Sequence, residues 1–181
     1  MESGTVTVIV GEGGVVYCYY TFVQRGSIVL TKTTDISSNT DRFTFTGDLS
    51  GEIPSGEEIT LDDIVPGQYS FAEAALAGWD LTGITCDDAN SSGDIGTATA
   101  TFNIAAGQVV KCTFTNTKRG QITVEKQTLP SGDPQSFNFT DDLAAGLTDG
   151  QSASLEVIPG TYTSTESSLE GWDLTGLTCD D

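Results

Sequence analysis

The segment GWDLTGITCDD at Gly78–Asp88 occurs a second time in this chain, as GWDLTGLTCDD at Gly171–Asp181. The two copies begin 93 residues apart (171 − 78) and differ only where Ile84 is replaced by Leu177. A period of this length is enough for one small domain with its own core. The chain is therefore expected to be built from repeated domains.

Further matches extend the repeat on both sides of this segment. GSIVLTK (residues 26–32) returns as GQITVEK (120–126), and VPGQYSFAE (65–73) returns as IPGTYTSTE (158–166). GGVVYCYYTFVQRG (13–26) matches AGQVVKCTFTNTKRG (106–120). Residues 26–119 read as one complete unit, 120–181 as the first two-thirds of a second, and 1–25 as the last third of a unit. The N-terminal residues thus correspond in type to the last strands of a unit, which the second unit lacks.

The local pattern predicts β-strands throughout. Apolar and polar residues alternate in short runs, as in Phe43–Thr46, Ser27–Lys32, Thr99–Ile104 and Val109–Thr115. Gly- and Asp-rich segments separate these runs. Phe71–Ala77 is the only helical candidate. Many short strands at even spacing predict an all-β fold of tandem sandwich domains, or a partly open barrel.

Charge restricts the classes of function. The chain has 7 Lys and Arg against 26 Asp and Glu, a formal net charge of −19, and no His. Nucleic-acid binding needs a basic surface, so it is not expected. No run has the ~20 apolar residues of a membrane helix, so membrane insertion is not expected either. The absence of His excludes a His-dependent catalytic triad, and the acidic balance suits an extracellular protein.

The four cysteines occupy equivalent positions in the repeat. Cys86 and Cys112 fall within one unit, whereas Cys18 and Cys179 form the same pair divided between the two ends of the chain. No Cys-x-x-Cys spacing is present, which argues against zinc. Disulfides in an oxidising compartment are the favoured interpretation, and four buried free thiols are the alternative.

Each unit resembles the Cna-B-type, prealbumin-like domains of Gram-positive pilins and surface adhesins. The resemblance covers nearly the whole chain and rests on the order of several short motifs. The motifs are, in order, a strand ending in Lys (Lys32), a Phe-x-Phe strand (Phe43–Phe45) and Pro-Gly-x-Tyr followed by Glu (Pro66–Glu73). A Gly-aromatic pair (Gly78–Trp79) and a final strand with Asn (Asn116) follow. The resemblance implies a prealbumin-like (Ig-like) β-sandwich.

The resemblance also implies a spontaneous isopeptide bond. In this family a Lys on the first strand and an Asn or Asp on the last form an amide, promoted by a Glu on a middle strand. Carried over residue by residue, these are Lys32, Asn116 and Glu73. The alternative is a strand-end Lys, a surface Glu and a turn Asn. The second unit has Lys126 and Glu166, but the position equivalent to Asn116 is Phe22 (116 − 94), so no such bond is expected there.

The two ends of the chain are complementary. Residues 120–181 are expected to leave sheet edges open, and open edges attract further strands. Residues 1–25 are expected to form an apolar donor hairpin, which is marginal alone. Insertion into a neighbouring copy would give a head-to-tail homopolymer, with Cys18–Cys179 disulfides between subunits. The residues expected to fill the neighbour's core are Val6, Val8, Val10, Val15, Tyr17, Tyr19 and Phe22.

Other candidate sites have weaker signals. Trp79 and Trp172 are expected to be core residues, with carbohydrate stacking as the alternative. The acidic clusters of Asp87, Asp88 and Asp94, and of Asp180 and Asp181, are interpreted as solvated loops, with calcium binding as the alternative. Asn90 and Asn138 stand in glycosylation sequons. No other metal or cofactor is expected.

The sequence therefore predicts a structural subunit of an extracellular filament or pilus-like fibre. The alternatives are the stalk or ligand-binding repeat of a surface adhesin, and a window of one long tandem-repeat fibre protein. No spacing of carboxylates or Gly-rich loop indicates an enzyme site. At most a single-turnover isopeptide reaction is expected.

Overall fold

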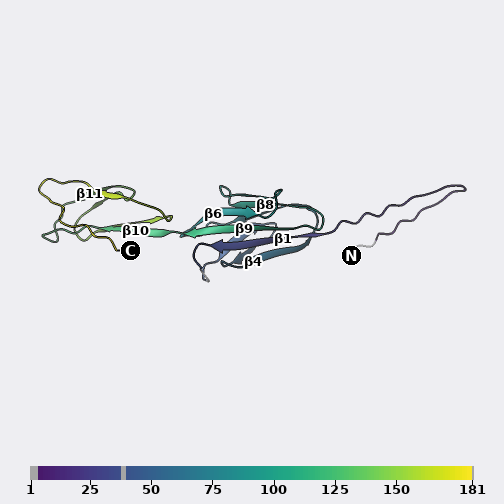
Figure 1. The fold of residues 1–181 in the computed structure, drawn as a ribbon, viewed down its shortest axis with the longest axis horizontal. Coiled ribbons are helices and arrows are strands. Elements are labelled where there is room, and N and C mark those ends of the chain that lie inside the picture. The colour runs from purple at the N-terminus through teal and green to yellow at the C-terminus, as the bar shows by residue number, and fades with distance from the viewer. Residues whose placement is uncertain (1–3, 38–39, 181) are drawn as a thin grey trace.

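The computed structural model describes residues 4–37 and 40–180, and all regular structure in these ranges is β. Three parts follow one another along the long axis of the molecule (Figure 1). The N-terminal arm (residues 4–25) projects from one end, the first unit (residues 26–118) lies in the middle, and the second unit (residues 120–180) lies at the other end. No helix in the described residues is long and apolar enough to cross a membrane.

The first unit is a sandwich of two sheets. One sheet has the order β4-β1-β9-β6, and the other has the order β3-β2-β5-β8-β7. Its strands are β1 (Gly26–Thr34), β2 (Phe43–Gly47), β3 (Gly51–Ile53), β4 (Glu58–Ile64), β5 (Gly67–Glu73), β6 (Trp79–Cys86), β7 (Ser92–Asp94), β8 (Thr99–Ile104) and β9 (Val109–Lys118). The predicted all-β, prealbumin-like sandwich is confirmed.

The core of the first unit lies between the inner faces of these sheets. Strand residues alternate between buried and partly exposed positions, as the two-residue period of a strand requires. Aromatic rings meet edge to face between the two sheets in the pairs Phe45–Phe114 and Phe43–Trp79, and between neighbouring strands of one sheet in the pair Phe71–Phe102. Burying such side chains contributes roughly 1.5–3 kcal/mol each.

The second unit repeats only part of this architecture. Its strands form a two-stranded sheet β10-β13 and a three-stranded sheet β12-β11-β14. They are β10 (Gly120–Glu125), β11 (Phe137–Asp141), β12 (Ala145–Leu147), β13 (Ser152–Val157) and β14 (Ser164–Glu166). By repeat position these correspond to β1, β2, β3, β4 and β5. Its buried cluster is small and centres on Phe137, Phe139 and Leu147.

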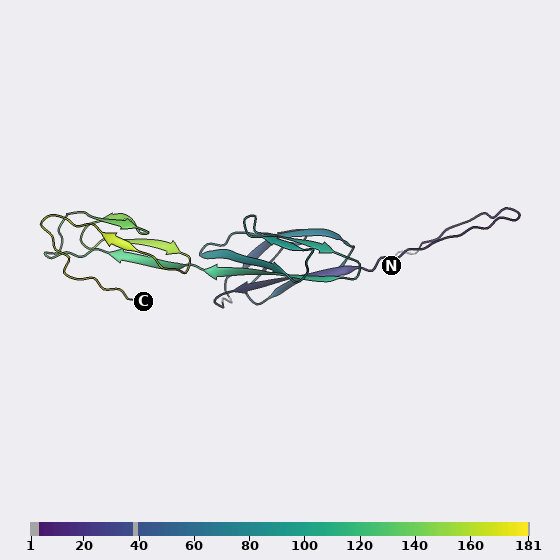
Figure 2. The ribbon, with the colours of Figure 1, turned by 45° about the horizontal axis from the view of Figure 1, so that its top comes forward.

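Residues 172–180 have no strand partner among the described residues. Their counterpart in the first unit is β6, but here the chain is a trace beyond β14 (Figure 2). Leu174 and Leu177 are 67% and 76% exposed. In the first unit, β6 is held by its pairing with β9. Among the described residues, no strand takes the place of β9 beside residues 172–180, so this segment stays unpaired.

The N-terminal arm doubles back at a turn, where the Gly14 amide donates to the Gly11 carbonyl. Neither half of it is a strand, and its large apolar side chains are exposed. The helix considered for Phe71–Ala77 is wrong: β5 continues to Glu73, and the following residues form a loop in which the Trp79 amide donates to the Leu76 carbonyl. Pairing of β5 with β8 supplies the tertiary contact that overrides local helix propensity.

Candidate functional site

Lys32, Glu73 and Asn116 meet inside the first unit. Lys32 lies on β1 and Asn116 on the neighbouring parallel strand β9, in the sheet β4-β1-β9-β6. Glu73 is the last residue of β5, in the opposite sheet. All three residues are buried, and Lys32 has no exposed surface. The inward alternation of both sheets therefore aims an amine, a carboxamide and a carboxyl group at one point of the core.

The geometry places the three groups in contact. Lys32 Nζ donates to Asn116 Oδ1 at 2.7 Å, and Asn116 Nδ2 donates to Glu73 Oε1 at 2.6 Å. The other carboxyl oxygen, Glu73 Oε2, lies 3.6 Å from Lys32 Nζ and makes no hydrogen bond in the structure. One glutamate thus faces both the nucleophilic nitrogen and the amide nitrogen that would leave.

Burial sets the protonation of this pair. Desolvation lowers the pKa of Lys32 to about 8, although the nearby Glu73 carboxyl acts in the opposite direction. Desolvation also raises the pKa of Glu73 above its ordinary value, against the opposing effects of Lys32 and the hydrogen bond from Asn116. Both shifts favour the neutral amine and the neutral acid. Lys32 Nζ also lies 4.1 Å from the centroid of the Phe43 ring.

This arrangement supports amide formation between two side chains. A neutral Lys32 amine can attack Asn116 Cγ. This carbon carries Oδ1, the atom to which Lys32 Nζ already donates a hydrogen bond. Glu73 can take a proton from the attacking nitrogen and give one to Asn116 Nδ2. A pocket of about 460 Å³ beside the site is lined by Glu73 and Asn116 together with the loop 74–78.

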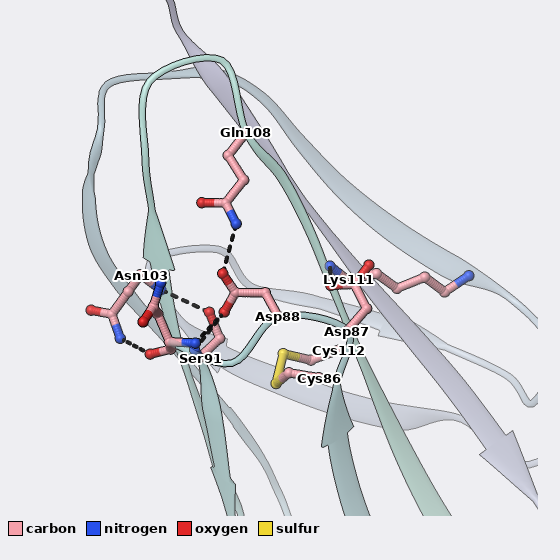
Figure 3. The surroundings of a disulfide bond; sticks show 9 residues. Cys86, Asp87, Asp88, Ser91, Asn103, Gln108, Lys111 and Cys112 are labelled. Atoms are coloured by element: carbon pink, nitrogen blue, oxygen red, sulfur yellow. Dashed lines mark hydrogen bonds between the residues drawn. A yellow bond between two sulfur atoms is a disulfide. The ribbon is translucent and has the colours of Figure 1, made fainter.

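A disulfide joins Cys86 to Cys112, the last pair in the register of β6 with β9 (Figure 3). The loop that follows Cys86 is held by carboxylates: Asp87 accepts from the Lys111 amide, and Asp88 accepts from the Ser91 amide and the Gln108 side chain. Cys18 and Cys179 are free and exposed, so within one chain they do not pair.

The second unit contains two members of the same constellation. Lys126 Nζ lies 2.6 Å from Glu166 Oε1 and 3.9 Å from the centroid of the Phe137 ring. These contacts repeat those of Lys32 with Glu73 and Phe43. The side chains of Lys126 and Glu166 are 12% and 19% exposed, compared with 0% and 2% for Lys32 and Glu73. The second site is preformed but open on the side where β9 lies in the first.

The alternation of β9 revises the set of core-filling residues in the arm. With the offset of 94, Val6, Val8 and Val10 correspond to three buried residues of β8. Phe22 corresponds to the buried Asn116. Val15, Tyr17 and Tyr19, however, correspond to β9 positions that face away from the core, which argues against them as core residues. In the register of β9, the residues of this half that would face inward are Val16, Cys18, Tyr20 and Phe22.

Other sequence candidates are placed as follows. Trp79 is buried in the core, as predicted, and its indole nitrogen donates to Asp41. Asn90 and Asn138 are exposed, so both sequons are accessible, and glycosylation stays a prediction. Within residues 4–37 and 40–180 no group of three His, Cys, Asp or Glu residues could hold a metal ion. Asp181, in the second acidic cluster, lies outside the described residues.

Two contacts were not predicted from the sequence. The first is the contact of the Phe43 ring with Lys32. The available signal was that the Phe-x-Phe motif follows the Lys at the same spacing in both units (43 − 32 and 137 − 126). At the junction of the units, Arg119 makes two hydrogen bonds to Asp80, at 2.8 and 2.7 Å. The repeat of the Arg-Gly pair at Arg25–Gly26 and Arg119–Gly120 was the signal for this contact.

Comparison with protein families decides the class of the chain. The family model SpaA_4, described as a prealbumin-like fold domain, matches residues 28–118. The chain belongs to this family. The matched residues coincide with the first unit, from β1 to the end of β9. A comparison with curated protein sequences found no significant match.

Solved structures similar to the chain include three bacterial proteins. An adhesin from Mobiluncus mulieris, which contains intramolecular disulfide, isopeptide and ester cross-links, has 21% identity over 52% of this chain and 42% of its own, with a TM-score of 0.45. The Bacillus anthracis TIE protein has 16% identity over 80% of this chain and 28% of its own, with a TM-score of 0.42. A streptococcal ancillary pilin has 14% identity over 81% and 51%, with a TM-score of 0.36. The chain spans about half or less of each, and these likenesses carry no argument about function.

Proposed function

We propose that this prealbumin-like protein is a structural subunit of an extracellular filament, in which the N-terminal arm of one copy completes the second unit of the next. The observation that carries the proposal is the complementarity of two regions. The arm is similar in sequence to β8 and β9, but its described residues pair with no strand. The second unit has the counterparts of β1–β5 but an open edge. Each region exposes apolar side chains that the other would cover.

The first unit supplies the register of the proposed joint. There β9 lies between β1, in parallel, and β6, antiparallel. By the same register, residues 15–24 of one copy would lie between β10 and residues 172–179 of another. Residues 5–10 would pair with β14, as β8 pairs with β5. Each added strand satisfies backbone groups that the open edge leaves free for pairing.

The register also brings the two free cysteines together. Cys86 is directly opposite Cys112 in the pairing of β6 with β9. The equivalent pair in the joint is Cys179 of one copy and Cys18 of the next. Both thiols are exposed in the single chain, so neither is committed to another partner. We propose that this disulfide joins subunits, as Cys86–Cys112 joins strands within one unit.

Charges at the junction fit the same arrangement. Within the chain, Arg119 forms hydrogen bonds to Asp80. Asp80, and the negative charge of Glu156 on β13 of the second unit, raise the pKa of Arg119. Arg25 is the counterpart of Arg119, and it already donates to the carbonyl of Asp63, the counterpart of Glu156. Asp173, the counterpart of Asp80, would be its partner in another copy. Head-to-tail contact of this kind repeats without closing and builds a filament.

We further propose that Lys32 and Asn116 form an isopeptide bond within each first unit. The Nζ–Cγ bond forms, the Cγ–Nδ2 bond breaks, and Nδ2 leaves as ammonia with the proton relayed by Glu73. The bond would join β1 to β9, the first and last strands of the unit. Such a link resists extension of the unit, which suits a fibre under load.

The test is a pair of denaturing gels, with and without reductant, on protein assembled under oxidising conditions, together with intact mass. The account predicts a ladder without reductant that collapses to one band with it. The monomer should weigh about 17 Da less than its sequence, because amide formation from Lys and Asn releases one ammonia. Cys179→Ser is the matched control: it should abolish the ladder but leave the mass deficit and the Cys86–Cys112 disulfide.

Three other outcomes would each remove part of the proposal. Monomers under both conditions, with no filaments by electron microscopy, would contradict polymerisation and favour the stalk of an adhesin. A very large band that survives reduction in native material would show one long tandem chain, in which the next repeat supplies the strands. An intact mass equal to the sequence mass would show that Lys32 and Asn116 stay unlinked.

A further inference from the structure

The site around Lys126 and Glu166 is complete except on one side. The ion pair and the Phe137 ring stand as their counterparts do in the first unit, with Lys126 Nζ at 2.6 Å from Glu166 Oε1. In the first unit, Asn116 of β9 closes the equivalent site and forms hydrogen bonds with both Lys32 and Glu73. The position that closes the second site is therefore the counterpart of Asn116.

That counterpart is Phe22, and three matches fix the alignment around it. Cys18 corresponds to Cys112, Arg25 to Arg119 and Gly26 to Gly120, each with an offset of 94 residues. Within the arm, Phe22 is 84% exposed and has no aromatic contact among those described. In the register of β9, it would face the core beside the first strand, as Asn116 does.

We propose that Phe22 of one copy covers the Lys126–Glu166 pair of the next copy and keeps this joint free of an isopeptide bond. The inference rests on the proposed strand exchange between copies. A phenyl ring removes water from the pair and offers a second aromatic face to the Lys126 ammonium, opposite Phe137. It carries neither an electrophilic carbon nor a leaving nitrogen, so Lys126 has nothing to attack.

Two kinds of connection then alternate along the fibre. Inside each first unit, Lys32 and Asn116 have the groups for a permanent amide. At each joint the same pocket holds an ion pair and a ring, and Cys18–Cys179 is the covalent link that remains. Position 22 is thus the residue that determines whether the joint between copies is held by packing and a reducible disulfide or by an amide.

The experiment is to replace the ring with the reactive group. Full-length Phe22→Asn chains, assembled and then boiled in detergent with reductant, are expected to give a ladder, whereas wild-type ladders collapse. Each joint should lose about 17 Da as ammonia. A digest should yield one cross-linked peptide pair, in which Lys126 is joined to residue 22. Lys126→Arg and Glu166→Gln in the Phe22→Asn background are the matched controls and should abolish the ladder.

A directional mixture sharpens the test. A chain carrying both Phe22→Asn and Lys126→Arg can only donate the carboxamide, and a wild-type chain can only supply the amine. The two together should give reductant-resistant dimers, and neither should give them alone. Filaments of Phe22→Asn without any such bond would overturn the inference and leave the proposed strand exchange intact. Wild-type chains that never assemble would overturn the proposed exchange itself.

A measurement on the unmodified chain keeps the inference testable if Phe22→Asn fails to assemble. Lys126 is partly exposed in the single chain, and Lys111 has 43% of its side chain exposed. Brief acetylation of wild-type filaments should modify Lys111 as in the monomer but spare Lys126. Assembled Phe22→Ala chains should regain modification at Lys126. Equal acetylation of Lys126 in monomer and filament would overturn the proposed placement of Phe22.

Discussion

β6 and residues 172–179 have nearly the same sequence, yet only β6 is a strand. In the first unit, Trp79–Cys86 pairs with β9 along its whole length, and Trp79 is buried. In the second unit, the turn before the segment and the Phe137–Trp172 ring contact are kept, but the residues after Trp172 are extended and exposed. The difference teaches that this segment acquires strand structure from its partner, not from its own propensity.

The largest effect should come from supplying the missing partner within one chain. In a variant that begins at residue 26 and carries residues 4–25 after a flexible linker beyond residue 181, the arm can fold back into the second unit. Several buried apolar side chains, at roughly 1.5–3 kcal/mol each, should then stabilise that unit. We expect a monomer with a cooperative second unfolding transition by calorimetry.

The control for this variant has the same linker with Val8→Asp and Tyr20→Asp, which put carboxylates on the inward face of the arm. It should stay monomeric and lack the added transition. An equally stable second unit in the control would show that the arm does not insert in the register of β8 and β9.

Breaking the amide should make the first unit more like the second. Asn116→Ala removes the carbon that Lys32 attacks, so the mass deficit should disappear. A link between residues 32 and 116 closes a long loop, and by the loop-entropy argument for cross-links its loss should cost about 4 kcal/mol. Denaturant unfolding measures this change. Glu73→Gln is the companion variant: if it also forms the bond at the normal rate, Glu73 is not the proton relay.

The pH dependence of bond formation tests the state of the buried pair. Because burial lowers the pKa of Lys32 to about 8, most amines carry a proton below that pH and cannot attack. In chains refolded from an unreacted, denatured state, the rate should rise towards pH 8, by up to about tenfold per unit. Loss of the Glu73 proton should oppose this rise, because the carboxylate, whose pKa burial raises, can then no longer give a proton to Asn116 Nδ2. Intact mass against time gives the rate, and a rate independent of pH would contradict this assignment.

The smallest effect should come from the junction charges. Arg25→Asp should weaken assembly modestly, because an exposed ion pair contributes about 1 kcal/mol or less. Asp173→Arg alone should do the same, and the two changes together should restore assembly. Sedimentation at low and moderate salt measures the difference. Additive losses in the double variant would show that Arg25 and Asp173 do not meet.

Much of the first unit could be predicted from the sequence. The resemblance to prealbumin-like domains placed Lys32, Glu73 and Asn116 at the family's positions, and the alternation of apolar and polar residues predicted the strands. Which face of the arm would turn inward could not be predicted from the arm alone, because it carries apolar and aromatic residues at both odd and even positions. The unpaired state of residues 172–180 was also not predictable from a nearly identical motif, since strand pairing depends on a partner distant in sequence.

Amide hydrogen exchange of residues 172–180, measured from dilute monomer to assembled protein, tests the central claim most directly. The equivalent β6 peptide in the same sample is an internal reference. The account predicts that residues 172–180 exchange freely in dilute protein and become protected on assembly, while β6 stays protected throughout. Free exchange of residues 172–180 inside assembled filaments, or protection that is independent of concentration, would contradict strand exchange between copies.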